Sequence, residues 1–448
     1  MSIITYDPLN PLHLLLPVLE FFNNNSKELL YSVISVWLFL EFIFFIYMNF
    51  YIQRNLQRLN TPQPHNIHPV LHVNRIMDII DLISSYKFES FISRFFLGAN
   101  YLEVYEDNFK SFLSWAMYSS KICDISNEQK DAIDECYHEF CRRNNFKLPL
   151  GHNPKVNHVS MTLDHYKYYH RPLIFYIINH IINAMSSLLY QLHGFRKFKL
   201  NGFSYWIKIC GNQIQNNPPV LFFHGISPGW LLYFNLISTL GKGKSVILID
   251  LNAIKILSLE FNMPTPENFS KNIVKILKRH KIDRVSIVGH SFGSITAKWF
   301  IGHFPEFVDH LTLLDPVTIL LGLPDVAYSF LYRPPSNLMQ WIIYCIATTD
   351  PTISYNMYRN FWWYQNAMWF QDIPSHIGIV ACISGLDEIL NPQAIIEYIQ
   401  CYNKNNNTKA QIKTILWPNF SHGQILIHFK EQKRLAKLIE KSQNHILE

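Results

Sequence analysis

From residue 196 onward, short apolar runs alternate with segments in which apolar residues recur every three or four positions. Short apolar strands that alternate with helices indicate a mostly parallel sheet with helices on both faces. We therefore predict an α/β fold, whose functional side chains gather at the carboxyl ends of the strands. The predicted strands lie at residues 203–210, 219–225, 244–251, 284–290, 310–315, 376–384 and 410–418, and the predicted helices lie at 267–281, at 294–305, from 392 onward and near the C-terminus.

A different pattern, apolar at almost every position, fills residues 29–52, LLYSVISVWLFLEFIFFIYMNFYI. A helix of this length crosses the ~30 Å hydrocarbon core of a membrane. Glu41 is the only charged residue in the segment, and a central carboxyl is costly unless it is protonated or paired. The surrounding apolar side chains outweigh that cost, so we expect a transmembrane anchor. A buried or interfacial helix is the alternative.

The charges that flank this segment predict its orientation. Lys27 precedes it, whereas Arg54 and Arg58 follow it, and basic residues are enriched on the cytoplasmic side of membrane helices. We therefore expect a single-pass protein of an endomembrane, such as the endoplasmic reticulum or a lipid droplet, with its C-terminal bulk in the cytosol.

Residues 172–192 form a second apolar segment, but polar residues recur along it. Asn179, His180, Asn183, Ser187 and Gln191 follow one another at steps of about four, so on a helix they share one face. This pattern predicts an amphipathic helix that lies on a membrane or packs on the fold. A second membrane crossing is the alternative.

The patterns divide the 448 residues into three parts. Residues 1–60 carry the predicted anchor, residues 61–195 form a helical connecting region that includes the amphipathic helix, and residues 196–448 form the α/β domain. Within this domain, residues 317–375 interrupt the alternation of strands and helices. Asn268 or Ser270 is the expected cap of the helix at 267–281.

Composition narrows the choice of partners. The chain is 49% hydrophobic and only 16% charged, against about 25% charged in an average chain. The net charge of +6 is small for this length and no Lys/Arg block stands out, so nucleic acid is not an expected partner. Seven cysteines without a CxxC pair are expected to be free thiols. The histidines at 152, 158, 165 and 170 lack partners at ligand spacing, so we expect solvated loop histidines and no metal site.

The pattern G-x-S-x-G occurs at Gly289 to Gly293, within SIVGHSFGSI. It follows a predicted strand and opens a predicted helix, which is the context in which this pattern holds a serine on a sharp turn. The backbone bends so strongly at the serine that its neighbours on either side must lack bulk. Ser291 is therefore the candidate nucleophile.

A nucleophilic serine needs a base that takes its proton and an acid that orients the base. In this arrangement the acid and then the histidine come after the serine in the chain. Asp387 lies just past the strand at 376–384, and His422 lies just past the last predicted strand. We therefore predict that Ser291, Asp387 and His422 form a catalytic triad without a cofactor.

Other polar residues compete for these roles. Asp315 ends the strand at 310–315 and is the alternative acid, although a turn-initiating aspartate explains it equally simply. His310 and Asp315 form an H-x4-D string of the kind that some acyltransferases use, which we interpret as chance. Asp250 also follows a strand but precedes the serine, and His290 lies inside the turn, where it is expected to pack.

The oxyanion that forms during ester cleavage needs backbone N–H donors. We expect one from Phe292, directly after the serine, and one from Ile226, which follows His224-Gly225 at the end of the strand 219–225.

Together with Asp387, His422 and the Gly289 to Gly293 turn, these positions resemble the α/β-hydrolase fold superfamily over roughly residues 200–445. The strings LLDPV, LPDVAYSFLYRPP and FWWYQNAMW, with the apolar N-terminal segment, look like a little-characterised group of eukaryotic membrane-anchored members.

The resemblance implies that residues 317–375 form a cap over the site. This insert is rich in aromatic residues, namely Phe361, Trp362, Trp363, Tyr364, Trp369 and Phe370. It presents either an apolar pocket or membrane-facing surface, or else the hydrophobic core of a subdomain. A lipid or other apolar ester suits such a cap better than a sugar or a charged peptide.

The combined prediction is a membrane-anchored, lipase-like serine hydrolase that cleaves apolar or lipid carboxylic esters through an acyl-enzyme. An acyltransferase, in which an alcohol replaces water, would use the same residues. A non-catalytic lipid-binding or scaffold protein with the same fold is the alternative from a different class.

Overall fold

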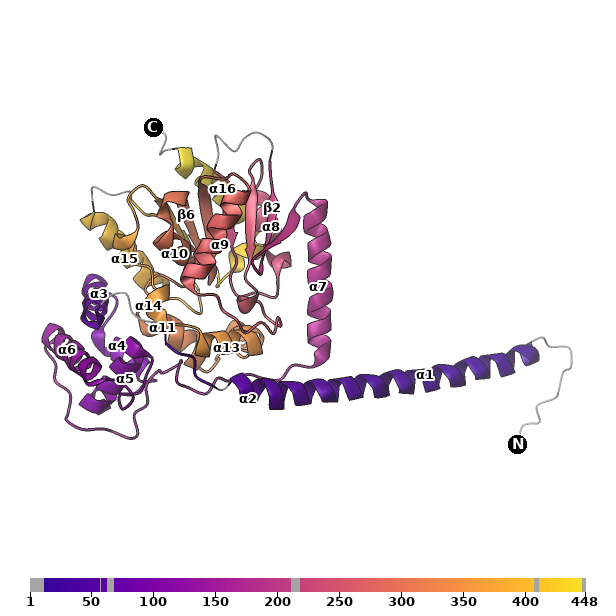
Figure 1. Ribbon diagram of the computed structural model, residues 1–448, viewed down its shortest axis with the longest axis horizontal. Helices are drawn as coiled ribbons and strands as arrows, with labels where there is room; N and C mark the ends of the chain where they lie inside the picture. The colour runs from indigo at the N-terminus through magenta and orange to yellow at the C-terminus, as the bar shows by residue number, and fades with distance from the viewer. Residues whose placement is uncertain (1–11, 57, 63–67, 211–217, 407–410, 445–448) are drawn as a thin grey trace. The chain divides into compact units, whose positions relative to one another are not determined.

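The computed structural model describes residues 12–56, 58–62, 68–210, 218–406 and 411–444 (Figure 1). The chain divides into two compact units, which are residues 1–58 with 170–175, and residues 59–169 with 176–448. The first unit is built on one long apolar helix. The second contains the sheet, its covering helices and most of the helical region that precedes the sheet.

The first unit contains the predicted anchor. Helix α1 (Leu12–Ile46) continues as a π-helical turn, η1 (Tyr47–Ile52), and as α2 (Gln53–Leu56). Its segment Ser26–Phe50 has a mean hydropathy of 2.3 and is long enough to cross a membrane. Within this unit the carboxylate of Glu41 accepts the N–H of Leu173 at 2.9 Å and lies 3.5 Å from the imidazole of His170. The charge that interrupts the apolar segment therefore has partners.

The second unit is organised around an eight-stranded sheet with the order β1-β2-β4-β3-β5-β6-β7-β8. Strand β2 pairs antiparallel with β1 and β4, and all other neighbours are parallel. The pattern did not reveal β1, because it is a short edge strand with the mostly exposed sequence RKFKL. The strands are β1 (Arg196–Leu200), β2 (Phe203–Lys208), β3 (Val220–Phe223), β4 (Val246–Asp250), β5 (Val285–His290), β6 (Val308–Leu314), β7 (Gly378–Ser384) and β8 (Lys413–Trp417).

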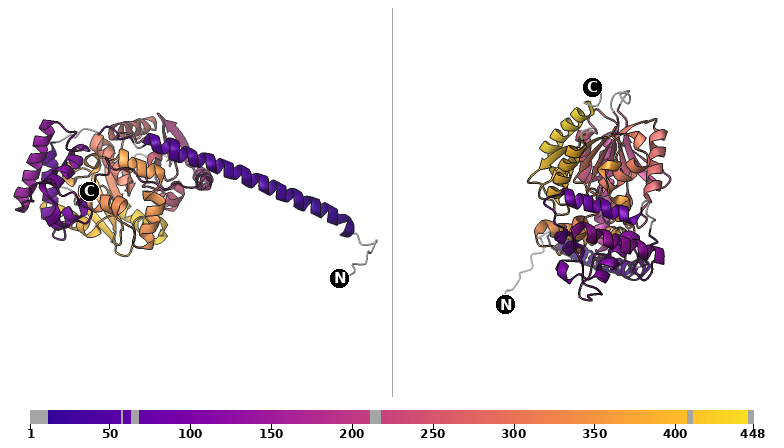
Figure 2. Two further views of the ribbon diagram at one scale, coloured as in Figure 1. Left: turned by 90° about the horizontal axis from the view of Figure 1, so that it is seen from below. Right: turned by 90° about the vertical axis from the view of Figure 1, so that its left-hand side faces the viewer.

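Helices cover both faces of the sheet, as Figure 2 shows. Strands β3, β4 and β5 are buried at every position, which explains their continuous apolar sequences. On one face, α8 (Phe234–Leu240) and α16 (Phe429–Asn444) pack over a core that includes Phe222, Leu236 and Leu435. The other covering helices include α9 (Pro266–Arg279) and α10 (Gly293–His303), and α15 (Pro392–Asn405) follows β7.

The predicted cap residue of α9 is wrong. The helix begins at Pro266, and the side chain of Thr265 accepts the N–H of Asn268 at 3.2 Å. Threonine is a favoured N-cap and proline a favoured first residue, so the Thr-Pro pair marks the start better than Asn268 or Ser270.

The insert between β6 and β7 is helical, as predicted. It contains α11 (Pro324–Ala327), η7 (Tyr328–Tyr332), α12 (Leu338–Ile343), η8 (Tyr344–Thr348), α13 (Pro351–Arg359), α14 (Trp363–Asn366) and η9 (Phe370–Asp372). Most of its aromatic string is buried. Phe370, for example, stacks on Tyr398 of α15. The exposed apolar side chains of the insert belong to α12 and η8 instead, where Leu338, Trp341 and Ile346 face outward.

The helical region before the sheet packs against this insert (Figure 1). It comprises α3 (Pro69–Leu82), α4 (Phe88–Phe95), η2 (Tyr101–Glu103), α5 (Glu106–Tyr118) and α6 (Asn127–Asn144). Asp325 of α11 accepts the hydroxyl of Tyr86 at 2.9 Å and forms an ion pair with Arg94. The indole N–H of Trp363 donates to the carbonyl of Ala116 at 2.7 Å. The region is thus a structural support of the insert as well as a connection. His158 within it packs against Phe96 and is not a solvated loop residue.

Helix α7 (Leu173–Leu192) confirms the predicted polar stripe and gives it a direction. The amides of Asn179 and Asn183 donate to the carbonyls of Ile256 and Pro228, at 3.3 and 3.0 Å. Asn179 and Asn183 therefore face the protein, whereas His180 and Gln191 of the predicted stripe are exposed. Large apolar side chains face outward, namely Ile177, Ile178, Ile181, Ile182, Met185 and Leu188. This orientation is the reverse of an ordinary surface helix.

Candidate active site

The loop between β5 and α10 holds Ser291 in a conformation that few residues adopt. Its φ angle is 51°, in the left-handed region. A Cβ atom on Gly289 would lie 2.7 Å from the carbonyl oxygen of Gly293, and one on Gly293 would lie 2.1 Å from the carbonyl oxygen of Phe223. Both flanking positions therefore require glycine, as the G-x-S-x-G pattern predicts. Strained backbone of this kind is concentrated at functional sites.

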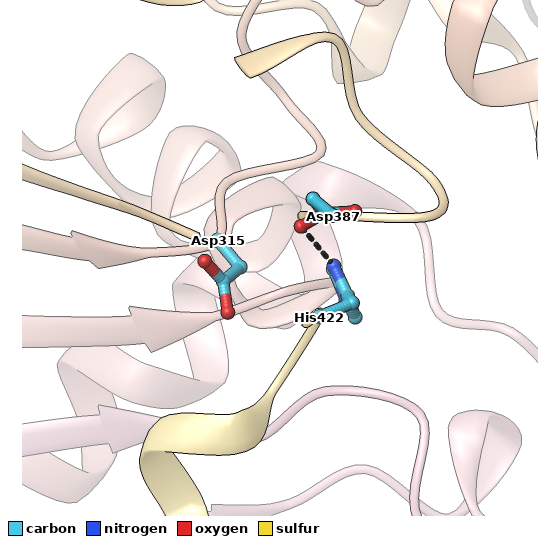
Figure 3. Close-up of side chains that lie close together, drawn as sticks. All are labelled: Asp315, Asp387 and His422. Carbon is cyan, nitrogen blue, oxygen red and sulfur yellow. Dashed lines mark hydrogen bonds and ion pairs between the residues drawn. The ribbon is translucent and has the colours of Figure 1, made fainter. Parts of the chain in front are cut away.

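The structure brings Ser291, His422 and Asp387 together, although they lie far apart in the sequence. Nε2 of His422 lies 2.9 Å from Oγ of Ser291, and its Nδ1 lies 2.6 Å from Oδ2 of Asp387. Figure 3 shows the contact between the imidazole and Asp387. The backbone N–H groups of Ile389 and Leu390 donate to the other oxygen of Asp387, at 2.8 and 2.9 Å. The carboxylate is thereby fixed toward the imidazole.

Asp315, the alternative acid, lies beside this group but bonds to different partners (Figure 3). One of its oxygens accepts the N–H of Ser384 at 2.9 Å, and the other accepts the N–H of Gly423 at 2.8 Å. It is fully buried and has a φ angle of 45°. Asp387 therefore makes the contact with the imidazole, whereas Asp315 ties the histidine loop to the end of β7.

The charges in this cluster shift the pKa values in opposite directions. Burial alone would lower the pKa of His422, but the charge and hydrogen bond of Asp387, with the charges of Asp315 and Glu388, raise it above its ordinary value. Burial raises the pKa of Asp315. For Asp387 the effect of burial is outweighed by His422 and by two backbone N–H groups, so its pKa is lowered. The arrangement stabilises a charged imidazolium.

Asp315, Asp387 and His422 also form the one group, among the described residues, whose ligand atoms lie close enough together to hold a metal ion. All four carboxylate oxygens already accept hydrogen bonds from backbone N–H groups or from the imidazole. The carboxylates of Asp315 and Asp387 thus hold His422 and its loop in position.

The loop that follows β3 approaches Ser291 closely. A Cβ atom on Gly225 would lie 2.8 Å from Cβ of Ser291, so only glycine permits this approach. Ile226, the next residue, and Phe292 line the same pocket as Ser291. Among the described residues, the backbone–backbone hydrogen bonds outside helices and strands include none donated by the N–H groups of Ile226 and Phe292. These are the two N–H groups that the sequence suggests for an oxyanion.

Two buried side chains hold that loop in place. Nδ1 of His224 donates to the carbonyl of Gly225 at 2.8 Å, and its Nε2 accepts the N–H of Leu251 at 3.2 Å. Burial, assisted by Lys255, lowers the pKa of His224 to about 4, so it stays neutral. The hydroxyl of Tyr233 accepts the N–H of Gly225 at 2.9 Å. No motif in the sequence marks this role for Tyr233, because only the fold brings its hydroxyl to the loop.

The remaining polar candidates lie outside the catalytic contacts. His290 is buried, and burial holds its pKa well below the ordinary value. Its Nδ1 lies 3.0 Å from the hydroxyl of Tyr233, consistent with a packing role. Asp250 forms an ion pair with Lys255. His310 lies near the start of β6 and Asp315 just past its end, roughly 16 Å apart at ~3.3 Å per residue, so the H-x4-D string does not form a site.

A large apolar pocket opens above the serine. Its volume is about 530 Å³, and both Ser291 and His422 line it. One wall comes from loops at the carboxyl edge of the sheet, including Ile226 and Leu232. The insert supplies much of the other wall, with Val326, Phe330, Met339, Ile342, Ile343, Ile346, Ala347, Met357 and Phe361. The insert is therefore a cap over the candidate site.

A strained serine at the carboxyl edge of a mostly parallel sheet, under a helical cap, is the arrangement of a hydrolase of the α/β class. A family model described as the alpha/beta hydrolase fold matches residues 218–378. The sheet and its covering helices therefore have the α/β-hydrolase fold.

Among known proteins, the chain is similar to a serine hydrolase-like protein of Mus musculus, with 30% identity over 28% of this chain and 41% of that protein. It is also similar to a serine hydrolase-like protein of Homo sapiens, with 28% identity over 30% of this chain and 66% of that protein. The matched region thus spans less than two thirds of the length of either relative.

Solved structures share the fold more distantly. A bacterial membrane phospholipase A has 12% identity and a TM-score of 0.41, over 61% of this chain and 94% of that one. A putative aryl esterase from Burkholderia cenocepacia has 12% identity and a TM-score of 0.38, over 56% of this chain and 100% of that one. Sequence identities and TM-scores this low provide no evidence about function.

Proposed function

We propose that this protein is a membrane-associated serine hydrolase that cleaves long-chain or otherwise apolar carboxylic esters. The observation that carries the proposal is the continuous contact from Ser291 through His422 to Asp387, which opens into an apolar pocket. The carboxylates of Asp387 and Asp315 outweigh the effect of burial and favour the imidazolium that forms when His422 takes the serine proton.

The geometry supports an acyl-enzyme mechanism. Oγ of Ser291 attacks the ester carbonyl carbon while Nε2 of His422 takes the hydroxyl proton. The backbone N–H groups of Ile226 and Phe292 stabilise the oxyanion. The tetrahedral intermediate then expels the alcohol, which takes the proton from His422. Water attacks the acyl-enzyme by the same route, releases the carboxylic acid and restores the serine.

The shape of the site supports an apolar substrate. Many residues around Ser291 and His422 in the pocket are aliphatic or aromatic, and the lining contains no Asp, Glu, Lys or Arg. A sugar or a charged peptide would lose hydrogen bonds with water there and find few replacements. An acyl chain would instead lose only its contact with water, which is favourable.

Two helices support association with a membrane. In the first unit, Ser26–Phe50 has the length and hydropathy of a membrane span. In the second unit, the outward face of α7 exposes Ile178, Ile181, Met185 and other large apolar side chains. Contiguous apolar surface of this kind marks an interaction site, and a lipid surface fits it. We propose that α1 is an anchor and that α7 lies against the same membrane. We also propose that the second unit, which carries Ser291 and is called the hydrolase unit below, is cytosolic.

A fluorophosphonate probe tests whether Ser291 is a reactive nucleophile. We expect the full-length protein to be labelled, Ser291→Ala to lose the label, and the exposed-serine control Ser336→Ala to retain it. No labelling of the folded wild type would favour the non-catalytic lipid-binding alternative. Product analysis with and without an acceptor alcohol separates the hydrolase from an acyltransferase, because only the transferase would form mostly the new ester.

A further inference from the structure

A second apolar cavity of about 60 Å³ lies next to the pocket above Ser291. The two spaces share Val326, Phe330, Met357 and Phe361 in their walls, so these four side chains form the partition between them. Phe361 also contacts the residue after the candidate nucleophile, since its ring lies 6.3 Å from the ring of Phe292. The partition therefore begins beside the reacting atoms.

The far wall of this inner cavity comes from the helical region before the sheet. Helices α3 to α5 supply Ile76, Phe91, Phe112 and Ala116, and the insert supplies Gly322 and Leu331, among others. Every residue that lines the cavity is apolar or glycine. The region predicted as a connection is thus half of the wall of an internal space.

The polar atoms of the two tryptophans in this wall already have partners. Nε1 of Trp115 donates to the hydroxyl of Thr162 at 2.9 Å, and Nε1 of Trp363 donates to the carbonyl of Ala116 at 2.7 Å. A cavity without free polar groups does not hold water well and binds apolar guests. Since a water-sized group needs about 10–15 Å³ by this measure, the space has room for roughly four to six methylene groups.

We propose that the inner cavity receives the distal end of the substrate's acyl chain, so that the helical region at 69–144 sets the preferred chain length. The inference rests on the proposed function for its substrate. The substrate's acyl chain would extend from the ester carbonyl beside Phe292, pass between Phe330 and Phe361, and end against α4 and α5. A long unbranched acyl chain fits this path, whereas a short acyl group would occupy the outer pocket alone.

Chain-length profiles test this proposal. We suggest p-nitrophenyl esters from butyrate to palmitate, presented to the full-length protein in mixed micelles of constant composition. Ala116→Leu fills the inner cavity without touching the outer pocket, and Ala132→Leu on α6 is a matched control, because Ala132 is also buried but lines neither space. In Ala116→Leu, kcat/KM for palmitate should fall about tenfold or more relative to butyrate. The ratio should be unchanged in Ala132→Leu.

A second arm does not depend on catalysis. A palmitate analogue with a terminal diazirine, photolysed on Ser291→Ala protein, should crosslink to peptides of α4 and α5 within residues 88–118. Ala116→Leu should remove those crosslinks and leave crosslinks to α12 and η8.

The two experiments distinguish a failure of the proposed hydrolase function from a failure of the proposed acyl site. If no ester is cleaved but the crosslinks fall within 88–118, the hydrolase function is wrong and the cavity remains a binding site for an acyl chain. If esters are cleaved but Ala116→Leu changes neither the chain-length ratio nor the crosslinks, the inner cavity is not an acyl site. Crosslinks confined to α12 and η8 in the Ser291→Ala protein would equally overturn the inference.

Discussion

The carboxylate of Asp315 accepts the backbone N–H of Gly423 at 2.8 Å, one residue after the histidine that contacts Ser291. Two buried carboxylates thus act on the same loop in different ways. Asp387 bonds to the imidazole of His422, and Asp315 bonds to the backbone that carries it. Glu388 adds a third contact, because it accepts the hydroxyl of Ser421 at 3.1 Å.

Substitution of the two aspartates should have unequal effects. Asp387→Asn removes the acceptor that fixes the tautomer of His422, so we expect kcat to fall by about 10³- to 10⁴-fold. Asp315→Asn loses one of two backbone hydrogen bonds but leaves the imidazole contact, so a loss of about 10- to 100-fold is expected. Ester hydrolysis by the purified variants measures both. A larger loss in Asp315→Asn than in Asp387→Asn would mean that Asp315 is the catalytic acid.

The raised pKa of His422 predicts an alkaline profile. The imidazole must be neutral to accept the serine proton, so kcat/KM should rise as the pH rises through the folded-state pKa, above the ordinary value of about 6.5. The stability that His422 contributes runs the other way. It is fully present below the unfolded pKa and is lost as the pH rises through the folded pKa. Asp387→Asn should shift the midpoint of the activity profile downward, and an unshifted midpoint would contradict the assignment.

The glycines of the serine turn should not tolerate a side chain. Gly293→Ala places Cβ against the carbonyl oxygen of Phe223, at 2.1 Å before any relaxation, so the free energy of unfolding should fall by about 3 kcal/mol. Gly302→Ala on the same helix is the control, since a Cβ there meets nothing within 4 Å. It should leave stability unchanged or raise it by up to about 1 kcal/mol. Chemical denaturation measures the free energy of unfolding of both variants. Equal changes in Gly293→Ala and Gly302→Ala would argue against the observed turn.

The sequence predicted most of the fold and the candidate triad because these depend on local patterns. Apolar runs located seven strands, and the G-x-S-x-G pattern located Ser291. The order of the chain then pointed to Asp387 and His422. Asp315 remained an alternative, because only three-dimensional contacts show that its oxygens bond to Ser384 and Gly423.

Features that depend on long-range packing were less predictable. A periodic pattern shows that α7 has a polar side, but not that Asn179 and Asn183 turn that side toward the protein. Helices α3 to α6 carry no motif that predicts a part in an internal cavity. Only three-dimensional contacts, such as the hydrogen bond from Trp363 to Ala116, show that they pack against the insert. The edge strand β1 was missed because its exposed, charged sequence lacks the apolar signal of the inner strands.

The proposed topology makes a prediction about glycosylation. The sequence contains four acceptor motifs: one at Asn24, before the apolar segment, and three in the α/β domain, at Asn268, Asn406 and Asn419. If the hydrolase unit is cytosolic, the motifs at Asn268, Asn406 and Asn419 are not modified, and a glycosidase should not change the mobility of the Asn24→Gln protein in gels. Asn24, or an acceptor motif added further toward the N-terminus, lies on the opposite side and should be modified if it is far enough from the membrane to reach the enzyme. Modification at Asn268, Asn406 or Asn419 would place the hydrolase unit in the lumen.

The same experiment can include membrane extraction. High-salt or alkaline washes should leave the full-length protein in the membrane fraction, because a spanning helix is held by its apolar side chains rather than by charge. Release by alkali would indicate that α1 does not cross the bilayer.

The central claim is that Ser291 forms a covalent acyl intermediate, and acid-quenched mass spectrometry tests it most directly. The full-length protein is mixed with a long-chain p-nitrophenyl ester, quenched in acid and digested. We predict an acyl adduct on the peptide that carries Ser291, no adduct in Ser291→Ala, and little adduct in His422→Ala, because the hydroxyl then lacks a base. Turnover of the ester without an adduct on Ser291, or with the adduct on another residue, would contradict the account.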